Sequence, residues 1–432
     1  MPSILHAFTK LIALGSLGIA AGLSALTLLA SVVSHMRRNR QDSQLREPIT
    51  LLKPLCGAEP GLYEDLKSFC TQNYPAYQIV FGLRDPADPA REVAERLRAE
   101  HPDVPIDIVI DPRLHGSNKK VSNLINMQPC AKHSVLVIVD SDVVVEPDYL
   151  TAVTAPLLDP NVGLVTCIYR SLPTPGVWSQ LGAMYINEWY VPTVLLAWLF
   201  GHRRYVSGQT MCLRQETLRS IGGFWAAANH LADDYRLGEL VGNLGLRVIL
   251  SPYRVEAEHH EPSFNAMMRH EARWMQTLRA LRPRSFCGLF LTFNVPLSAF
   301  GMTIAVVGGS DLTTAYTLFA VALCLRCTLH LLQFSHRRGA WLSGLWMVPI
   351  RDLLLCWVWS QTFWSSRITW RGHEFELAPG GLMRQHKQPG IGAPPFSRAD
   401  DFGWVGRMSP FGARPKGSRH KEIGQSDFPE NR

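Results

Sequence analysis

Apolar and mixed stretches alternate along this chain. The first apolar stretch, Leu11–Ser34, contains no charged residue. Three more follow Phe286, namely Leu289–Val307, Thr314–Phe334 and Trp341–Trp364. A helix that crosses a bilayer needs about 20 predominantly apolar residues, so the pattern predicts an N-terminal membrane anchor and a C-terminal membrane region.

The residues on either side of the first stretch indicate whether it is cleaved or retained, and how it is oriented in the membrane. Lys10 precedes it, as in a cleaved signal peptide, which is the alternative to an anchor. The apolar core of a signal peptide is only about 7–15 residues long, however, and this stretch is followed by Arg37, Arg38 and Arg40. We therefore predict an anchor, and because basic residues stay on the cytoplasmic side we expect the following domain in the cytoplasm.

Between about residues 50 and 250, short apolar runs are separated by amphipathic stretches. The runs Tyr77–Leu83, Ile106–Ile110 and Ser134–Val139 are almost continuously apolar, as buried parallel strands are. The stretch Pro86–Glu100 has the spacing of an amphipathic helix. This alternation predicts a doubly wound α/β domain with a mostly parallel sheet, in which ligands bind beyond the carboxyl ends of the strands.

The last apolar stretch, Trp341–Trp364, carries Arg351 and Asp352 near its middle, close to Pro349. Adjacent charges are costly in hydrocarbon unless they are paired or buried in protein. We expect the stretch to be broken there and to be re-entrant or interfacial, with a cytoplasmic tail after it; one full crossing is the alternative. The shorter stretch Asn187–Phe200 is predicted to be an interfacial helix.

The composition supports a membrane protein. Of the 432 residues, 47% are hydrophobic and 18% are charged, whereas soluble domains have a charged fraction of about 25%. The net charge of +7 is dispersed, which suits the anionic face of a membrane and does not indicate a nucleic-acid partner. Nine cysteines without dense spacing exclude a small disulfide-rich secreted protein.

Candidate chemistry begins with Asp140 and Asp142, which flank Ser141 directly after the run Ser134–Val139. Two carboxylates at the end of a strand can hold Mg²⁺ or Mn²⁺ together with a phosphate oxygen of a substrate. A solvated turn is the alternative for so short a pattern, but the position after a buried strand favours the metal site. His260 is a weaker candidate for a further metal ligand.

Two further acidic pairs follow turns of the predicted domain. Asp85 and Asp88 come after the run that ends at Leu83 and could accept hydrogen bonds from a nucleobase or ribose. Asp233 and Asp234 open a helical stretch, and neighbouring carboxylates that are partly buried raise one another's pKa, as a general base requires. In both places the carboxylates could instead cap the N-terminus of a helix.

Basic and aromatic side chains complete the set of candidates. His270, Arg273 and Trp274 lie on a helical stretch just before the C-terminal membrane region. The guanidinium could bind a diphosphate and the indole a sugar or lipid, although a basic juxtamembrane helix with an interfacial Trp is the alternative. Lys119 and Lys120 could contact phosphate or could form an exposed basic turn.

Taken in order, these motifs resemble those of membrane-bound, processive-type glycosyltransferases with the GT-A fold, which have an early Asp, an Asp-x-Asp, a later Asp and a Gln/Arg-x-x-Arg-Trp motif. The resemblance is greatest to the ceramide glucosyltransferase-like family and, within it, to the glycosyltransferases of hopanoid biosynthesis. It covers roughly residues 11–377. The strings that carry it are Leu52–Tyr63, Phe81–Ala90, Asp111–Asn126, Asp140–Leu150 and Leu231–Gly238.

The resemblance implies a GT-A domain with transmembrane helices at both ends, a divalent cation as cofactor, and inverting transfer from a UDP-sugar to a lipid hydroxyl. It also implies the role of each candidate. Asp88, with Asp85 beside it, would contact the nucleotide, Asp140 and Asp142 the metal and diphosphate, Arg273 the diphosphate and Trp274 the acceptor, and Asp234 would be the base. His270 departs from the family, which usually has Gln or Arg at this position.

The substrates and location follow from the same resemblance. The first choice is transfer from UDP-N-acetylglucosamine to a hopanoid polyol such as bacteriohopanetetrol, and the alternative is transfer from UDP-glucose to ceramide. A processive polysaccharide synthase and a non-catalytic membrane scaffold are less favoured. We expect a multi-pass protein of the bacterial inner membrane, with an anchor and linker at 1–48, a cytoplasmic GT-A domain at 49–285, a membrane region at 286–377 and a disordered basic tail at 378–432.

Overall fold

The computed structural model describes residues 2–36, 46–59, 61–334, 344–370 and 373–385, all of which belong to one compact unit, Met1–His386. Arg37, Arg38, Arg40 and Trp341 lie outside the described residues, as does the tail beyond residue 385. The orientation inferred from the three arginines and the disorder of the tail therefore stay predictions.

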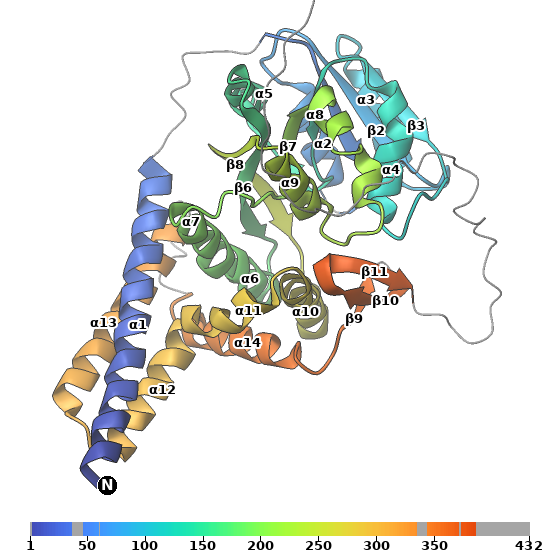
Figure 1. Cartoon of the computed structure of the whole chain (residues 1–432). Coiled ribbons are helices and arrows are strands. Elements are labelled where there is room, and N and C mark those ends of the chain that lie inside the picture. The colour runs from blue at the N-terminus through green and yellow to red at the C-terminus, as the bar shows by residue number, and fades with distance from the viewer. Residues whose placement is uncertain (1, 37–45, 60, 335–343, 371–372, 386–432) are drawn as a thin grey trace, which may run out of the picture. The chain divides into compact units, whose positions relative to one another are not determined.

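A mixed sheet of eight strands, in the order β3-β2-β1-β4-β7-β6-β8-β5, forms the centre of the chain (Figure 1). Strands β3, β2, β1 and β4 run parallel to one another, as do β6 and β8, whereas β7 and β5 are antiparallel to their neighbours. The strands are β1 (Ile49–Pro54), β2 (Tyr77–Leu83), β3 (Ile106–Ile110), β4 (Val135–Ile138), β5 (Val143–Val144), β6 (Val162–Pro173), β7 (Met211–Arg214) and β8 (Arg247–His259).

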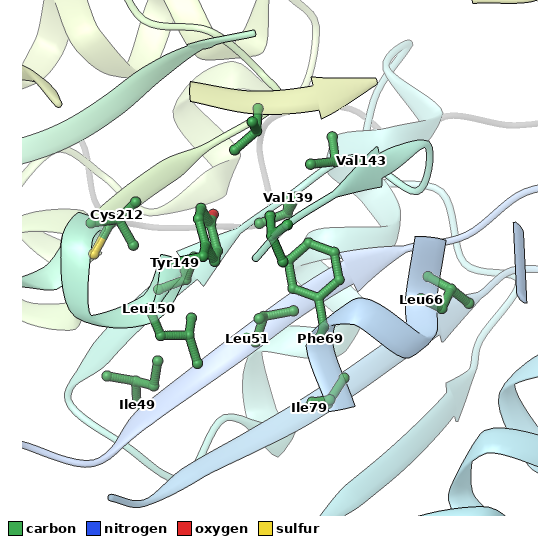
Figure 2. Close-up of a cluster of buried hydrophobic side chains, with 14 of the residues drawn as sticks. Ile49, Leu51, Leu66, Phe69, Ile79, Val139, Val143, Tyr149, Leu150 and Cys212 are labelled. Carbon is green, nitrogen blue, oxygen red and sulfur yellow. The ribbon is translucent and has the colours of Figure 1, made fainter. Parts of the chain in front are cut away.

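Helices bury both faces of this sheet. Successive side chains of a strand point to opposite faces, so neighbouring residues of one strand belong to different clusters. Leu51 of β1 belongs to a cluster that includes residues of α2, α3 and α5, and Leu52 belongs to a second cluster with residues of α4, α8 and α9. Figure 2 shows the first cluster, in which Phe69 and Tyr149 meet edge to face at 5.7 Å. The covering helices are α2 (Leu62–Cys70), α3 (Ala90–Glu100), α4 (Lys119–Met127), α5 (Tyr149–Thr154), α8 (Gln215–Ser220) and α9 (Asp233–Asn243). The predicted doubly wound sheet is confirmed.

Helices α1 (Pro2–Met36), α12 (Asn294–Val307) and α13 (Leu312–Phe334) pack side by side (Figure 1). Small residues let their backbones approach closely: a Cβ on Gly301 would lie 2.9 Å from Leu17 Cγ and 3.0 Å from the Ala13 carbonyl oxygen. By length and composition, Ile4–Met36 and Leu312–Gln333 are long and apolar enough to cross a membrane.

The expected span Leu289–Val307 is bent near its N-terminal end. A 3₁₀ turn, Leu289–Thr292, precedes α12, and the segments Pro283–Thr292 and Asn294–Val307 meet at 70°. Pro296 has no N–H to bond the carbonyl four residues earlier, at Thr292, so the helix cannot continue unbroken through this point.

The expected break at Arg351 and Asp352 is wrong, because α14 (Met347–Gln361) continues past these residues without interruption. Pro349 falls in the first turn of the helix, where a missing N–H costs no helical hydrogen bond. Its neighbours Arg351 and Asp352 are buried and paired with Glu271 and Arg326. With 15 residues, α14 is shorter than the roughly 20 needed for a crossing.

The remaining helices connect the sheet to this apolar region. The predicted interfacial helix Asn187–Phe200 is resolved into the π-helix Tyr185–Tyr190 and α7 (Val191–Leu199), which contacts α1. The other helices are α6 (Val177–Met184), α10 (Phe264–Leu281) and α11 (Pro283–Gly288). A second sheet, not expected from the sequence, comprises β9 (Arg367–Trp370), β10 (His373–Ala378) and β11 (Leu382–Gln385) in the order β11-β10-β9.

Candidate active site

Charged side chains from three segments meet beyond the carboxyl end of β4. Asp140 and Asp142 follow this strand, Lys120 lies in the first turn of α4, and Asp233 and Asp234 open α9. The Lys120 Nζ atom lies 2.6 Å from Asp140 Oδ1 and 3.5 Å from Asp233 Oδ2. The sequence predicts these residues as separate candidates, and the structure brings them together.

Gly208, in the turn between Ser207 and Thr210, marks the point on which three of these groups converge. A Cβ atom built on Gly208 would lie 3.1 Å from Asp140 Oδ2, 3.2 Å from Lys120 Nζ and 3.5 Å from Asp234 Oδ2. The absence of a side chain on Gly208 therefore leaves space beside a candidate metal ligand, a candidate phosphate-binding ammonium and a candidate base.

Replacing Gly208 with alanine is expected to raise KM for the sugar donor about tenfold, because overfilling a packed site costs about 1–3 kcal/mol. Gly288→Ala is the matched control, since a Cβ there meets nothing within 4 Å. Steady-state kinetics of both variants, with thermal melting to compare their stabilities, check this result. An unchanged donor KM in Gly208→Ala would show that the donor does not use this space.

Carboxylates outnumber ammonium groups in this cluster. Burial raises the pKa of Asp142 to about 7, with a further contribution from Asp140, and burial together with the charge of Asp233 raises the pKa of Asp234 to about 7. Burial opposes the charge of Lys120, but the carboxylates of Asp140 and Asp233 hold its pKa above the ordinary value. A raised pKa makes Asp234 a stronger base than an exposed carboxylate.

Lys53 is a second ammonium near these carboxylates and is not among the candidates predicted from the sequence. It is fully buried at the end of β1, with its Nζ 3.6 Å from the centre of the Phe69 ring and no hydrogen bond to any described residue. Burial lowers its pKa to about 7, while the charges of Asp142 and Asp65 oppose this shift. A lysine inside an otherwise apolar strand is the sequence signal that could have identified it.

The donor set fits a hard divalent cation in chemistry, but only in part. Asp140 and Asp142 supply carboxylate oxygens, which Mg²⁺ and Mn²⁺ prefer, in a cluster with excess negative charge. The part of the chain that the structure describes contains no group of three or more His, Cys, Asp or Glu side chains that could hold a metal. Further ligands would have to come from a substrate or water. His260 is exposed and hydrogen-bonds Thr174 at 3.1 Å, so it is left out of the proposed site.

Asp85 and Asp88 accept hydrogen bonds from backbone N–H groups. Both oxygens of Asp88 accept a hydrogen bond from the Gly57 N–H at 3.0 Å, and Oδ1 also accepts one at 2.9 Å from the N–H of Ala90, the first residue of α3. Asp85 Oδ1 accepts a hydrogen bond from the Ala87 N–H at 2.9 Å. Asp88 thus holds the loop after β1 in place, and nucleotide contact by either residue stays a prediction.

The motif residues on α10 pack against the apolar helices. The His270 ring lies 4.1 Å from Trp274, and its Nδ1 is 2.8 Å from Glu261 Oε1. Trp274 in turn stacks obliquely on Tyr185 of the π-helix at 5.4 Å. Arg273 occupies the preceding position on α10.

A buried ion pair fixes α10 to α14. The Arg351 Nη1 and Nη2 atoms donate to the two carboxylate oxygens of Glu271, each at 2.7 Å, and both side chains are 1% exposed. This pair holds the helix that carries His270, Arg273 and Trp274. The sequence shows Arg351 as a charge in an apolar stretch, but not its partner.

Three tyrosines beside the cluster were also missed. Tyr190 of the π-helix donates a hydrogen bond to Tyr205 at 3.1 Å, and its ring lies 6.4 Å from that of Tyr169. Burial, with a contribution from the charge of Asp234, raises the pKa of Tyr205 to about 12 against the effect of its hydrogen bonds. The π-helix therefore contacts a tyrosine whose pKa is affected by the charge of the candidate base.

Comparison with known proteins decides the family. The sequence model of glycosyl transferase family 21 matches residues 14–383. The chain belongs to glycosyl transferase family 21. Membership makes it an enzyme, a glycosyltransferase, and it confirms the ceramide glucosyltransferase-like family expected from the sequence.

Relatives of this family 21 glycosyltransferase include two ceramide glucosyltransferases. Ceramide glucosyltransferase 1 of Caenorhabditis elegans is 22% identical over 350 residues, which are 78% of this chain and 73% of that protein. The ceramide glucosyltransferase of Candida albicans is 32% identical over 114 residues, 24% of this chain and 21% of that protein. Among solved structures, a mannosyltransferase of Pyrobaculum calidifontis in complex with GDP-Man and Mn²⁺ has 18% identity and a TM-score of 0.48, covering 82% of this chain and 99% of that one.

Proposed function

We propose that this glycosyltransferase moves a sugar from a UDP-sugar to a hydroxyl group of a membrane lipid, with inversion at the anomeric carbon. The convergence of Asp140, Lys120 and Asp234 at Gly208 carries the proposal. It joins a candidate cation ligand, a positive charge for phosphate and a candidate base at one point. A single base suffices for one inverting displacement.

The chemistry assigned to these residues is a direct displacement. Asp234 accepts the proton of the acceptor hydroxyl as its oxygen bonds the anomeric carbon, and the bond from that carbon to the diphosphate oxygen breaks. Negative charge develops on the departing UDP, where Lys120 and Arg273 compensate it. When bound by Asp140 and Asp142, a divalent cation supplies further positive charge at the diphosphate.

The substrates we propose are UDP-N-acetylglucosamine and a hopanoid polyol, of which bacteriohopanetetrol is the example to test. Transfer from UDP-glucose to ceramide is the second candidate, and the names of the relatives favour it. Asp85 and Asp88 are proposed contacts of the nucleotide, and His270 and Trp274 of the acceptor side.

An assay of membranes that contain the chain tests these substrates. Each UDP-sugar, carrying a radiolabelled sugar, is supplied with each lipid, and the products are identified by mass spectrometry, with Asp234→Asn membranes as the control. We expect a labelled hopanoid from UDP-N-acetylglucosamine. Labelled ceramide in its place would establish the second candidate, and the lack of any glycolipid from all four combinations would contradict the proposed function.

Activity is expected to need a divalent cation. Transfer should cease in excess chelator and return when Mg²⁺ or Mn²⁺ is added, and Asp142→Ala should raise KM for the UDP-sugar while thermal melting shows a folded protein. Full turnover by enzyme verified to be metal-free would refute the cation requirement.

For the location we propose the bacterial inner membrane, with the domain at 49–285 in the cytoplasm and α14 as a re-entrant or interfacial element. Two features of α14 support this topology. It has 15 residues, and its central charges are paired with protein side chains rather than exposed to lipid.

A further inference from the structure

Lys120 contacts two carboxylates of the candidate active site that differ in exposure. Its Nζ atom lies 2.6 Å from Oδ1 of Asp140, a candidate ligand of the cation, and 3.5 Å from Oδ2 of Asp233. The side chains of Lys120 and Asp140 are 20% and 28% exposed, whereas that of Asp233 is 8% exposed. The pair with Asp140 is therefore accessible to a ligand, and the carboxylate of Asp233 is covered by protein.

The backbone of Lys120 is fixed, but its side chain has room to move. Asn118 caps α4 by accepting a hydrogen bond from the Val121 N–H at 3.1 Å. A Cβ atom built on Gly208 would lie 3.2 Å from Lys120 Nζ, so the missing side chain leaves space beside the ammonium group. Lysine has a flexible stem of four carbons. A change of partner by Lys120 thus needs no movement of the helix.

A cation and Lys120 compete for Asp140. The distance of 2.6 Å is that of direct contact, which leaves no room for a cation between Lys120 Nζ and Asp140 Oδ1. Both groups are positive, and like charges this close repel each other strongly where water is partly excluded. A cation that takes Asp140 as a ligand therefore weakens the pairing of Asp140 with Lys120.

Asp233 is the second carboxylate within reach of Lys120. Its Oδ1 atom accepts a hydrogen bond from Asn118 Nδ2 at 3.4 Å, whereas its Oδ2 atom is buried and has no hydrogen bond to any described residue. A buried acceptor without a hydrogen bond is costly. A short approach of Lys120 Nζ, from 3.5 Å to hydrogen-bond distance, would satisfy this oxygen.

We propose that Lys120 passes from Asp140 to Asp233 when a divalent cation binds together with the UDP-sugar. Asp140 then becomes a ligand of the cation, and Asp233 is a positioning residue that holds Lys120. An ammonium group has three N–H donors, so Lys120 held by Asp233 can still donate to a diphosphate oxygen. The inference rests on the proposed function, because it assumes a cation and a UDP-sugar.

The exchange makes binding of the cation and binding of UDP depend on each other. A cation alone meets the charge of Lys120 beside Asp140, whereas the negative diphosphate compensates both positive charges. UDP therefore raises the affinity for the cation, and the cation raises the affinity for UDP by the same factor.

Binding of Mn²⁺ to the full chain in detergent, followed by electron paramagnetic resonance, tests the exchange without turnover. In the wild type, UDP should raise the affinity for Mn²⁺ about tenfold, within the range of roughly 5–150-fold usual for coupled sites. Lys120→Met, which has no competing ammonium group, should bind Mn²⁺ without UDP about tenfold more tightly than the wild type does. If Lys120→Met fails to fold, Lys120→Gln takes its place with the same expected result.

Two controls separate competition from net charge. Lys120→Arg keeps the charge and should bind Mn²⁺ without UDP as weakly as the wild type. Lys132→Met also removes one positive charge, but Lys132 is 61% exposed and pairs with Asp107 of β3 at 3.0 Å. Its affinity for Mn²⁺ should equal that of the wild type.

A double-mutant cycle tests the part of Asp233. With UDP present, Asp233→Asn should weaken Mn²⁺ binding about fivefold, because Lys120 then lacks its second carboxylate. In the Lys120→Met background the same substitution should change little, since Asp233 acts through Lys120. An equal loss in both backgrounds would show that Asp233 acts only through its own charge and would overturn the exchange.

Two further results would also overturn it. They are an affinity of Lys120→Met for Mn²⁺ alone that does not exceed that of the wild type, and no binding of Mn²⁺ by the wild type even with UDP. These measurements need no acceptor. The expected coupling without any glycolipid product would therefore contradict the proposed transfer and leave the exchange standing, whereas glycolipid formation without the coupling would do the opposite.

Discussion

Asp234→Asn is expected to lower kcat for sugar transfer by about 10²–10⁴-fold, the usual cost of losing a general base. An amide has nearly the same shape as a carboxylate but cannot take the proton of the acceptor hydroxyl. The Asp234 carboxylate points into the space at Gly208 together with Asp140 and Lys120, so the substitution leaves these two groups in place. Binding of the UDP-sugar, measured by calorimetry, should therefore change little.

Asp233→Asn is the matched control for this prediction. Asp233 lies 3.5 Å from Lys120 Nζ and accepts a hydrogen bond from Asn118 at 3.4 Å, so it is held by neighbours rather than aimed at the space beside Gly208. Its substitution should weaken donor binding or stability more than the chemical step. Near-normal kcat in Asp234→Asn, together with inactive Asp233→Asn, would show that Asp233 rather than Asp234 is the base.

Arg351→Met is expected to lower the free energy of unfolding by about 3–5 kcal/mol, because it leaves a buried carboxylate without its partner. Glu271 and Arg351 are each 1% exposed and share two hydrogen bonds of 2.7 Å. The expected result is a large fall in melting temperature in detergent. Because α10 carries Arg273 and Trp274, protein that remains folded should also transfer sugar more slowly.

Two further variants show whether stability depends on the Glu271–Arg351 ion pair or on any change at a charged side chain. The double variant with Glu271→Leu and Arg351→Met should recover most of the stability, since replacing both members of a buried ion pair by apolar residues is close to neutral. Arg269→Met is the surface control on α10, where an exposed side chain should change stability by no more than about 0.5 kcal/mol. A single variant Arg351→Met as stable as the wild type would show that the pair does not hold α10 to α14.

Local patterns were sufficient for much of the fold. The apolar runs predicted as strands at Tyr77–Leu83 and Ile106–Ile110 coincide with β2 and β3, and the run at Ser134–Val139 contains β4. The long uncharged stretch at Leu11–Ser34 lies within α1. Strands β2 and β4 bury nearly all of their apolar residues, and α1 is long and apolar enough to cross a membrane, so the run of apolar residues along each element already contains the information.

The position of the Asp-x-Asp could also be read from the sequence, because it directly follows a buried strand. The residues that lie beside it in the folded protein could not be predicted from the sequence. Lys120, Asp140 and Asp234 come from three separate segments, and only the pairing of β1 with β4 and the packing of α4 and α9 bring them to Gly208. A glycine in a turn carries no sign of which charged groups face it.

The sequence by itself thus determined three strands of the central sheet, the apolar helices α1 and α13, and the family that the chain resembles. Tertiary structure decided the rest. Arg351 and Asp352 indicated a break in a helix because their partners, Glu271 and Arg326, are far away in sequence, and pairing removes the cost that the prediction assumed. The partner of Asp88, the Gly57 N–H, is likewise distant in sequence and could not be predicted from local pattern. Periodicity reports burial within one element, whereas the partner of a charge depends on which elements the whole fold places together.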